Sequence, residues 1–125
     1  MAVRADRTGF GEIEILQDPE GFCYGVDAVL LAGYARQAFE ERGREPERLM
    51  DLGTGTGIVP LILSHTTGIP DLRGLERNPE SFALAERNIE RNGLEGRVRF
   101  YLGDAADEEL PAREGLQAMA TAIPT

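Results

Sequence analysis

The chain has 125 residues, 42% of them hydrophobic, and a formal net charge of −9 in which arginine supplies every basic side chain apart from one histidine. This length and composition predict one small globular domain, and the acidic balance argues against a surface built mainly to hold a nucleic acid backbone. Cys23 is the only cysteine, which excludes an internal disulfide and a four-cysteine zinc site. No apolar run reaches the length of a signal peptide or a membrane span, so a cytoplasmic protein without membrane contact is predicted.

Residues 1–46 are predicted to form an N-terminal extension. The segment "GEIEILQ" (11–17) alternates apolar and acidic residues, which predicts a short half-exposed strand, and the turn sequence "DPEGF" (18–22) follows it. A helix is expected from Asp27, with Asp27 as its N-cap. Its predicted apolar face consists of Val29, Leu30, Ala32, Tyr34 and Phe39. The polar segment "RGREPE" (42–47) marks the boundary with the main fold.

Residues 47–125 are predicted to form the core, in which strands and helices alternate. Strands are expected at 48–52, 71–76 and 97–105, with helices at 57–66 and 78–93 between them. Asn78 is a suitable N-cap for the second of these helices, and Pro79 suits its first position. This succession predicts a Rossmann-like three-layer α/β sandwich with a parallel sheet. With a further strand in "LQAMAT" (116–121), the expected spatial order of these strands is 3-2-1-4.

The segment "DLGTGTG" (51–57) carries the clearest functional signal. Glycines after a strand let the chain turn sharply and bring backbone amides close to a ligand, so a ligand-binding loop is favoured over a plain tight turn. A phosphate-binding P-loop would need Lys and then Ser or Thr after the last glycine, but Ile58 and Val59 stand there. A dinucleotide site would need a GxGxxG pattern, which this register does not provide, so that alternative is weak.

Acidic residues follow the three expected strands. Asp51 ends the first strand, Glu76 the second, and Asp104 in "GDA" the third. An acid at the position of Glu76 can accept hydrogen bonds from both hydroxyls of a ribose, and one at Asp104 can accept the exocyclic amine of an adenine. Since the carboxyl ends of parallel strands share one edge of the sheet, these acids are expected to surround one crevice.

These motifs resemble those of the class I S-adenosylmethionine-dependent methyltransferases. "DLGTGTG" is similar to their glycine-rich first motif, and "GFCYGVDAVLLAGYA" (21–35) resembles the N-terminal signature of bacterial tRNA(Val) adenine-N6 methyltransferases. The resemblance implies a methyltransferase with S-adenosylmethionine as cofactor and tRNA as substrate. It also places Tyr24, Gly25 and Asp27 over the methionine end of the cofactor. The predicted cofactor-binding residues are thus Tyr24, Asp27, Asp51, Gly53, Thr54, Gly55, Gly57, Glu76, Asp104 and Ala105.

The sequence departs from this family where the methyl acceptor should bind. The family's "NPPY" motif, which holds the target adenine, is replaced by "AIPT" (122–125), and only Pro124 agrees. Little or no activity is therefore expected from this chain alone. It is predicted to be a truncated or frame-shifted gene product, which is favoured over assembly with a partner or a second copy. The alternatives are a non-catalytic cofactor-binding or assembly module, and a methyltransferase for protein glutamine or a small molecule. No catalytic residue is assigned, no metal site is expected, and His65 is interpreted as a surface residue at a helix end.

Overall fold

The computed structural model describes residues 3–21, 23–106 and 120–121. The strands β3, β4, β5 and β6 form a parallel sheet in the order β5-β4-β3-β6, and β1 and β2 form a separate antiparallel hairpin. The order 3-2-1-4 predicted for the core strands is therefore confirmed. The elements are β1 Arg4–Arg7, β2 Glu14–Gln17, α1 Val26–Arg42, β3 Arg48–Leu52, α2 Ile58–Thr66, β4 Asp71–Glu76, α3 Pro79–Arg91, β5 Val98–Leu102 and β6 Ala120–Thr121.

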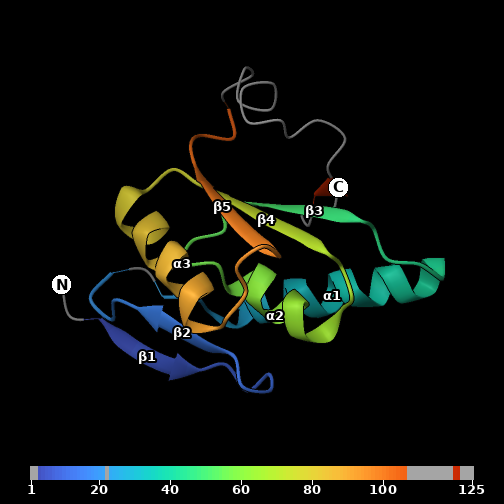
Figure 1. Ribbon diagram of the computed structural model, residues 1–125, viewed down its shortest axis with the longest axis horizontal. Coiled ribbons are helices and arrows are strands. Elements are labelled where there is room, and N and C mark those ends of the chain that lie inside the picture. The colour runs from blue at the N-terminus through green and yellow to red at the C-terminus, as the bar shows by residue number, and fades with distance from the viewer. Residues whose placement is uncertain (1–2, 22, 107–119, 122–125) are drawn as a thin grey trace.

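The helices α1, α2 and α3 lie on one face of the sheet, and the hairpin packs on the far side of the helices (Figure 1). The main hydrophobic core fills the space between the helices and the strands. It combines Leu49, Leu72 and Val98 from the sheet with α2, whose residues from Ile58 to Ser64 are all buried. Ile15 and Ala32 belong to the same core. The N-terminal segment and the sheet therefore share one hydrophobic core, and a domain boundary near residue 46 stays a prediction.

The other face of the sheet carries a smaller cluster. Met50 and Leu75 are buried there, with Leu52 and Tyr101 packed against them. Beside this cluster, the Arg73 guanidinium donates to the Asp71 carboxylate at 2.9 and 3.0 Å and to the Tyr101 hydroxyl at 2.9 Å. Among the described residues no helix covers this face, so the third layer of a three-layer sandwich stays a prediction.

The N-terminal segment differs from its prediction in two respects. The strand β2 is not half-exposed: Ile15, Leu16 and Gln17 are all buried, because β1 pairs with one edge of β2 and α3 covers the other. The pairing strand β1 was not predicted, since "RADR" has no apolar alternation. Strand burial here depends on tertiary contacts that a short segment does not encode.

The prediction that Asp27 caps α1 is wrong. The N-cap is Gly25, and Asp27 lies in the first helical turn, where its charge favours the positive end of the helix. The predicted apolar face is wrong in part, because Leu30 and Tyr34 are 63% and 62% exposed whereas Ala32 and Ala35 are buried. The helix α1 packs on α2 with Ala32 and Ala35 buried and with Val29, Leu31 and Phe39 partly buried against the core, which leaves Leu30 and Tyr34 on the outer side.

The ends of α3 agree with the sequence prediction. The Asn78 side chain accepts hydrogen bonds from the backbone N–H groups of Glu80 and Ser81, and Pro79 occupies the first helical position. This cap fixes where the helix starts after β4. It therefore also fixes the position of Glu76, which stands two residues before the cap.

Candidate functional site at the carboxyl edge of the sheet

The loop between β3 and α2 depends on its glycines. Gly53, Gly55 and Gly57 have φ angles of 74°, 62° and 95°, a region that other residues rarely adopt. A Cβ at Gly53 or Gly55 would meet no atom within 4 Å, whereas a Cβ at Gly57 would lie 2.5 Å from Phe100 Cζ. The first two glycines thus face open space above the loop, and the third permits close packing on the sheet.

Backbone hydrogen bonds hold this loop on the end of β4. The N–H groups of Gly53 and Thr54 both donate to the Leu75 carbonyl, at 2.8 and 2.9 Å, and the Gly57 N–H donates to the Thr54 carbonyl at 2.9 Å. Gly74 in β4 permits this close approach, since a Cβ there would lie 2.7 Å from Thr54 Cβ. The loop is therefore a rigid surface, preorganised before any ligand binds.

Glu76 joins the loop to the start of α3. Its Oε1 accepts a hydrogen bond from the Gly55 N–H at 2.9 Å, and its Oε2 accepts one from the Asn78 N–H at 2.9 Å. Each carboxylate oxygen retains acceptor capacity beyond these bonds. The side chain is only partly buried. It can therefore accept hydrogen bonds from hydroxyl groups of a ligand that lies across the edge of the sheet.

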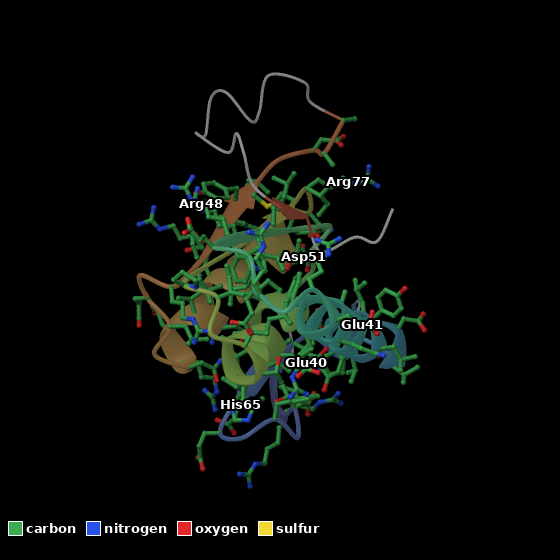
Figure 2. The ribbon with its side chains drawn as sticks, turned by 90° about the vertical axis from the view of Figure 1, so that its right-hand side faces the viewer. Glu40, Glu41, Arg48, Asp51, His65 and Arg77 are labelled. Atoms are coloured by element: carbon green, nitrogen blue, oxygen red, sulfur yellow. The ribbon has the colours of Figure 1, made fainter. Side chains whose placement is uncertain are left out.

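Asp51, labelled in Figure 2, is a buried residue near the end of β3, where the glycine loop begins. Burial raises the pKa of Asp51 from its ordinary 3.8 to about 6, while the neighbouring Thr54 hydroxyl lowers this pKa and the Glu76 charge raises it. Thr54 Oγ1 is itself buried and makes no hydrogen bond of standard geometry, so its effect on Asp51 is that of a nearby dipole. In the described part of the chain, no arginine forms an ion pair with Asp51.

Asp104 and Ala105 follow β5 and are exposed. The adjacent Gly103 N–H donates to the Glu76 backbone carbonyl at 2.9 Å, so the ends of β4 and β5 lie side by side. Within the part of the chain that the structure describes, the Asp104 side chain accepts one local hydrogen bond, from the Ala106 N–H at 2.9 Å. The structure thus joins Glu76 and the glycine loop by a hydrogen bond, with Asp51 buried close to Thr54 and Asp104 on the neighbouring strand end.

Tyr24 and Asp27 lie outside this network. The Tyr24 N–H donates to Gln17 Oε1 at 3.0 Å, which ties this segment to the hairpin, and Asp27 is exposed. Tyr24 and Gly25 line a surface hollow of about 590 Å³ between β1 and the start of α1. Within the described residues, no hydrogen bond joins Tyr24 or Asp27 to the glycine loop. Their role in cofactor binding stays a prediction.

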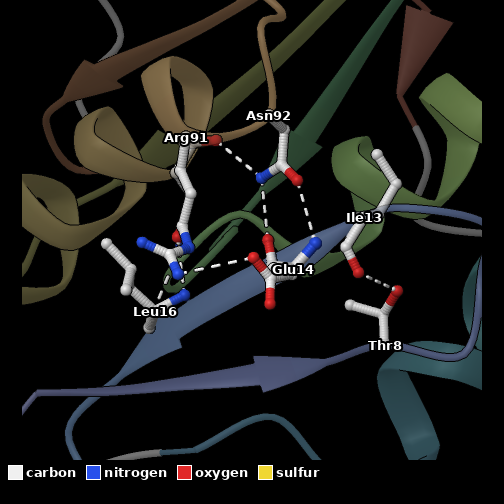
Figure 3. Close-up of polar contacts among 7 residues, drawn as sticks. Thr8, Ile13, Glu14, Leu16, Arg91 and Asn92 are labelled. Carbon is white, nitrogen blue, oxygen red and sulfur yellow. Dashed lines mark hydrogen bonds and ion pairs between the residues drawn. The ribbon is translucent and has the colours of Figure 1, made fainter.

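The sequence analysis did not identify Asn88 and Asn92, which attach the hairpin to α3. Asn92 Oδ1 accepts from the Glu14 N–H at 2.9 Å, and its Nδ2 donates to the Glu14 carbonyl at 2.7 Å (Figure 3). Asn88 makes the corresponding contacts with Leu16 and also reaches the glycine loop. The helical spacing of Asn88 with the buried Leu84 and Ala85 was a signal that this amide faces inward.

Several other predicted features can be placed as well. His65 is exposed in the last turn of α2, as predicted. Arg91 forms an ion pair with Glu14 at 3.4 Å (Figure 3), whereas Arg97 donates to the carbonyls of Ser64 in the last turns of α2 and of Thr67 and Ile69 after it. Over the described ranges, no cluster of metal-ligating side chains occurs, and none of the helices has the length and apolarity that crossing a membrane needs.

A family model for the methyltransferase small domain matches residues 29–114, which is more than half of the chain. The chain belongs to this family. The glycine loop, Glu76 and Asp104 all lie inside the matched range. The residues Tyr24 and Asp27 precede it.

Curated relatives and solved structures agree with this assignment. The chain is 29% identical over 112 residues to the tRNA1(Val) (adenine(37)-N6)-methyltransferase of Porphyromonas gingivalis. This match covers 90% of this chain and 43% of the relative. It is 31% identical over 84 residues to the protein of the same name from Pasteurella multocida, covering 66% of this chain and 33% of the relative. The chain thus spans less than half the length of either relative.

Among solved structures, Pyrococcus abyssi tRNA (uracil-54, C5)-methyltransferase in complex with S-adenosyl-L-homocysteine matches with a TM-score of 0.60 at 20% identity, over 82% of this chain and 24% of that one. P. horikoshii TYW2 in complex with MeSAdo matches with a TM-score of 0.63 at 18% identity, over 84% of this chain and 37% of that one. At this identity the likeness concerns the fold alone. It confirms the predicted Rossmann-like α/β class.

Proposed function

We propose that this chain binds S-adenosylmethionine and its demethylated product at the carboxyl edge of the sheet, as the cofactor-binding part of a methyltransferase. The observation that carries the proposal is the network in which Glu76 holds the Gly55 amide while Gly53 and Gly55 face open space. Family membership supports the assignment of this edge to a cofactor. The ligands in the similar solved structures, S-adenosyl-L-homocysteine and MeSAdo, support it as well.

The residues at this edge suit the chemistry of that cofactor. Glu76 would accept hydrogen bonds from the ribose hydroxyls, and Asp104 from the adenine amine. The surface over Gly53 and Gly55 has room for the methionine part, because a Cβ on either residue would meet no atom within 4 Å. The buried carboxylate of Asp51 would lie near the positively charged cofactor, and Tyr24 and Asp27 would close over the methionine end of that cofactor. The bound cofactor would supply an electrophilic methyl group.

We further propose that the methyl acceptor is the exocyclic amine of an adenine in tRNA. The names of the P. gingivalis and P. multocida relatives support this substrate, and so does the sequence signature around Tyr24. The position of the acceptor motif, residues 122–125, lies outside the described residues. Because that position reads "AIPT", we expect little turnover by this chain alone. A cytoplasmic location and self-association of the chain also remain predictions.

Calorimetric titration tests the cofactor proposal. S-adenosylhomocysteine added to the folded chain should give a saturable heat with one site per chain, whereas nicotinamide adenine dinucleotide should give none. The reverse pattern would overturn the assignment. A radiolabelled methyl-transfer assay with bulk tRNA, a protein extract and small-molecule amines in parallel then tests the acceptor. Robust labelling of protein instead of tRNA would refute the tRNA proposal.

A further inference from the structure

The Asn88 side chain lies between the N-terminal hairpin and the glycine loop. It is fully buried, with an exposed fraction of 0%. Its Oδ1 accepts from the Leu16 N–H at 2.6 Å, and its Nδ2 donates to the Leu16 carbonyl at 3.3 Å and to the Thr56 carbonyl at 2.8 Å. The amide orientation is unambiguous, since the Leu16 N–H needs an acceptor and the Thr56 carbonyl needs a donor. One side chain thus joins β2, α3 and the loop.

The contact with Thr56 fixes one peptide group of the loop from both sides. The Thr56 carbonyl accepts from Asn88, and the N–H of the same peptide group, that of Gly57, donates to the Thr54 carbonyl at 2.9 Å. Gly57 has a φ of 95° and precedes the first residue of α2. A peptide group adjacent to glycines would otherwise rotate easily, because glycine has a wide range of backbone conformations. Its orientation fixes where the Gly57 N–H points and how the glycine loop enters α2.

We propose that Asn88 is a positioning residue for the cofactor loop, and that through it the hairpin contributes to cofactor binding without touching the ligand. This inference rests on the function proposed above. The bond to Thr56 distinguishes Asn88 from Asn92, the C-cap residue of α3 four positions later. Asn92 bonds Glu14 in β2 and the Asn88 backbone carbonyl but makes no hydrogen bond to the glycine loop within the described chain. Asn92 therefore provides a control at the end of the same helix, where the side chain is partly buried.

The test compares Asn88→Asp with Asn92→Asp. Both substitutions keep the shape and an acceptor for β2 but remove the amide donor; only Asn88→Asp also removes the donor to Thr56. We expect Asn88→Asp to weaken S-adenosylhomocysteine binding roughly tenfold in calorimetry at a temperature where the variant is folded, and Asn92→Asp to stay within about twofold of the original chain. Equal losses in the two variants, or no loss in Asn88→Asp, would overturn the inference.

Hydrogen exchange separates this inference from the proposed function. Without ligand, Asn88→Asp should speed exchange of the Gly57 amide at least tenfold relative to Asn92→Asp, whether or not the chain binds a cofactor. Equal Gly57 exchange in the two variants would refute the positioning role even if the cofactor binds.

If Asn88→Asp does not fold, the original chain still provides a test. Bound S-adenosylhomocysteine should slow exchange of the Leu16 amide more than that of the Glu14 amide, because the coupling between loop and hairpin is reciprocal. Equal protection of the two amides would contradict the role of Asn88.

Discussion

The predicted cofactor-binding residues fall into two regions that differ in how firmly they are held. At the carboxyl edge of the sheet, the glycine loop is bonded to the Leu75 carbonyl, the Glu76 carboxylate and the Asn88 amide. The segment from Cys23 to Asp27 is tied to the hairpin instead, through the bond from the Tyr24 N–H to Gln17. The first region is a preorganised surface, and the second lies outside its network.

The two regions are expected to contribute to cofactor affinity in different ways. A preorganised loop loses little conformational entropy when a ligand binds, so substitutions that disturb it should cost both stability and affinity. Exposed residues such as Asp27 contribute little to stability, and any contribution to affinity must come from contacts formed only in the complex. The predictions below test this contrast, beginning with the largest expected effect.

The strongest contrast in stability is between Gly57→Ala in the loop and Gly43→Ala at the end of α1. Both glycines have positive φ, 95° and 75°, but a Cβ at Gly57 would lie 2.5 Å from Phe100 Cζ while one at Gly43 meets no atom within 4 Å. We expect Gly57→Ala to lower the free energy of unfolding by about 3 to 4 kcal/mol, through backbone strain and overlap. Gly43→Ala should cost about 1 kcal/mol, from strain alone. Urea unfolding measures both, and similar losses would show that the loop is not closely packed.

The buried carboxyl group of Asp51 should make the free energy of unfolding depend on pH. Because burial raises the pKa of Asp51 to about 6 in the folded chain, the folded state binds more protons than the unfolded state between about pH 4 and 6. The free energy of unfolding is therefore highest, as far as this group is concerned, below pH 4, where the carboxyl group is protonated in both states. It falls as the pH rises towards and through 6, because the group must then be ionised while buried. Asp51→Asn should be more stable than the original chain by about 2 to 3 kcal/mol at pH 7, with the gap closing near pH 4.

The control for that experiment is Asp27→Asn, since Asp27 is exposed in the first turn of α1. Its stability difference from the original chain should stay small at both pH values. Urea unfolding at pH 4 and pH 7 provides the comparison. A stability gap for Asp51→Asn that is unchanged between the two would contradict the burial of a titrating carboxyl group.

Substitutions of Glu76 and Asp27 test the same contrast through the affinity for S-adenosylhomocysteine. Glu76→Ala removes the acceptor for Gly55 and Asn78 together with the proposed acceptor for the ribose. We expect a loss of roughly 2 kcal/mol in S-adenosylhomocysteine binding, about thirtyfold in Kd. Asp27→Ala should weaken binding by less than about tenfold, because no bond to the loop is lost. A larger effect at Asp27 than at Glu76, measured by calorimetry, would reverse the ranking of the two regions.

How much of the structure could be predicted from the sequence depends on how far apart in the chain the interacting residues lie. The segments β3, α2, β4 and α3 have local signals, such as the Asn78 cap and the apolar period, and these were predicted with their parallel order. The start of α1 at Val26 and the outward turn of Leu30 and Tyr34 depend on how α1 packs on α2. The role of Asn88 could not be predicted because its partners, Leu16 and Thr56, are 72 and 32 residues away.

The central claim is that the cofactor lies across the glycine loop and the end of β4. Amide chemical-shift mapping during titration with S-adenosylhomocysteine tests it most directly. We expect the largest shifts at Gly53, Gly55 and Glu76, smaller ones at Asp104, and saturation at one equivalent of ligand. Shifts confined to the hollow between β1 and α1, at Arg4 and Val26, with the loop amides unchanged, would contradict the account.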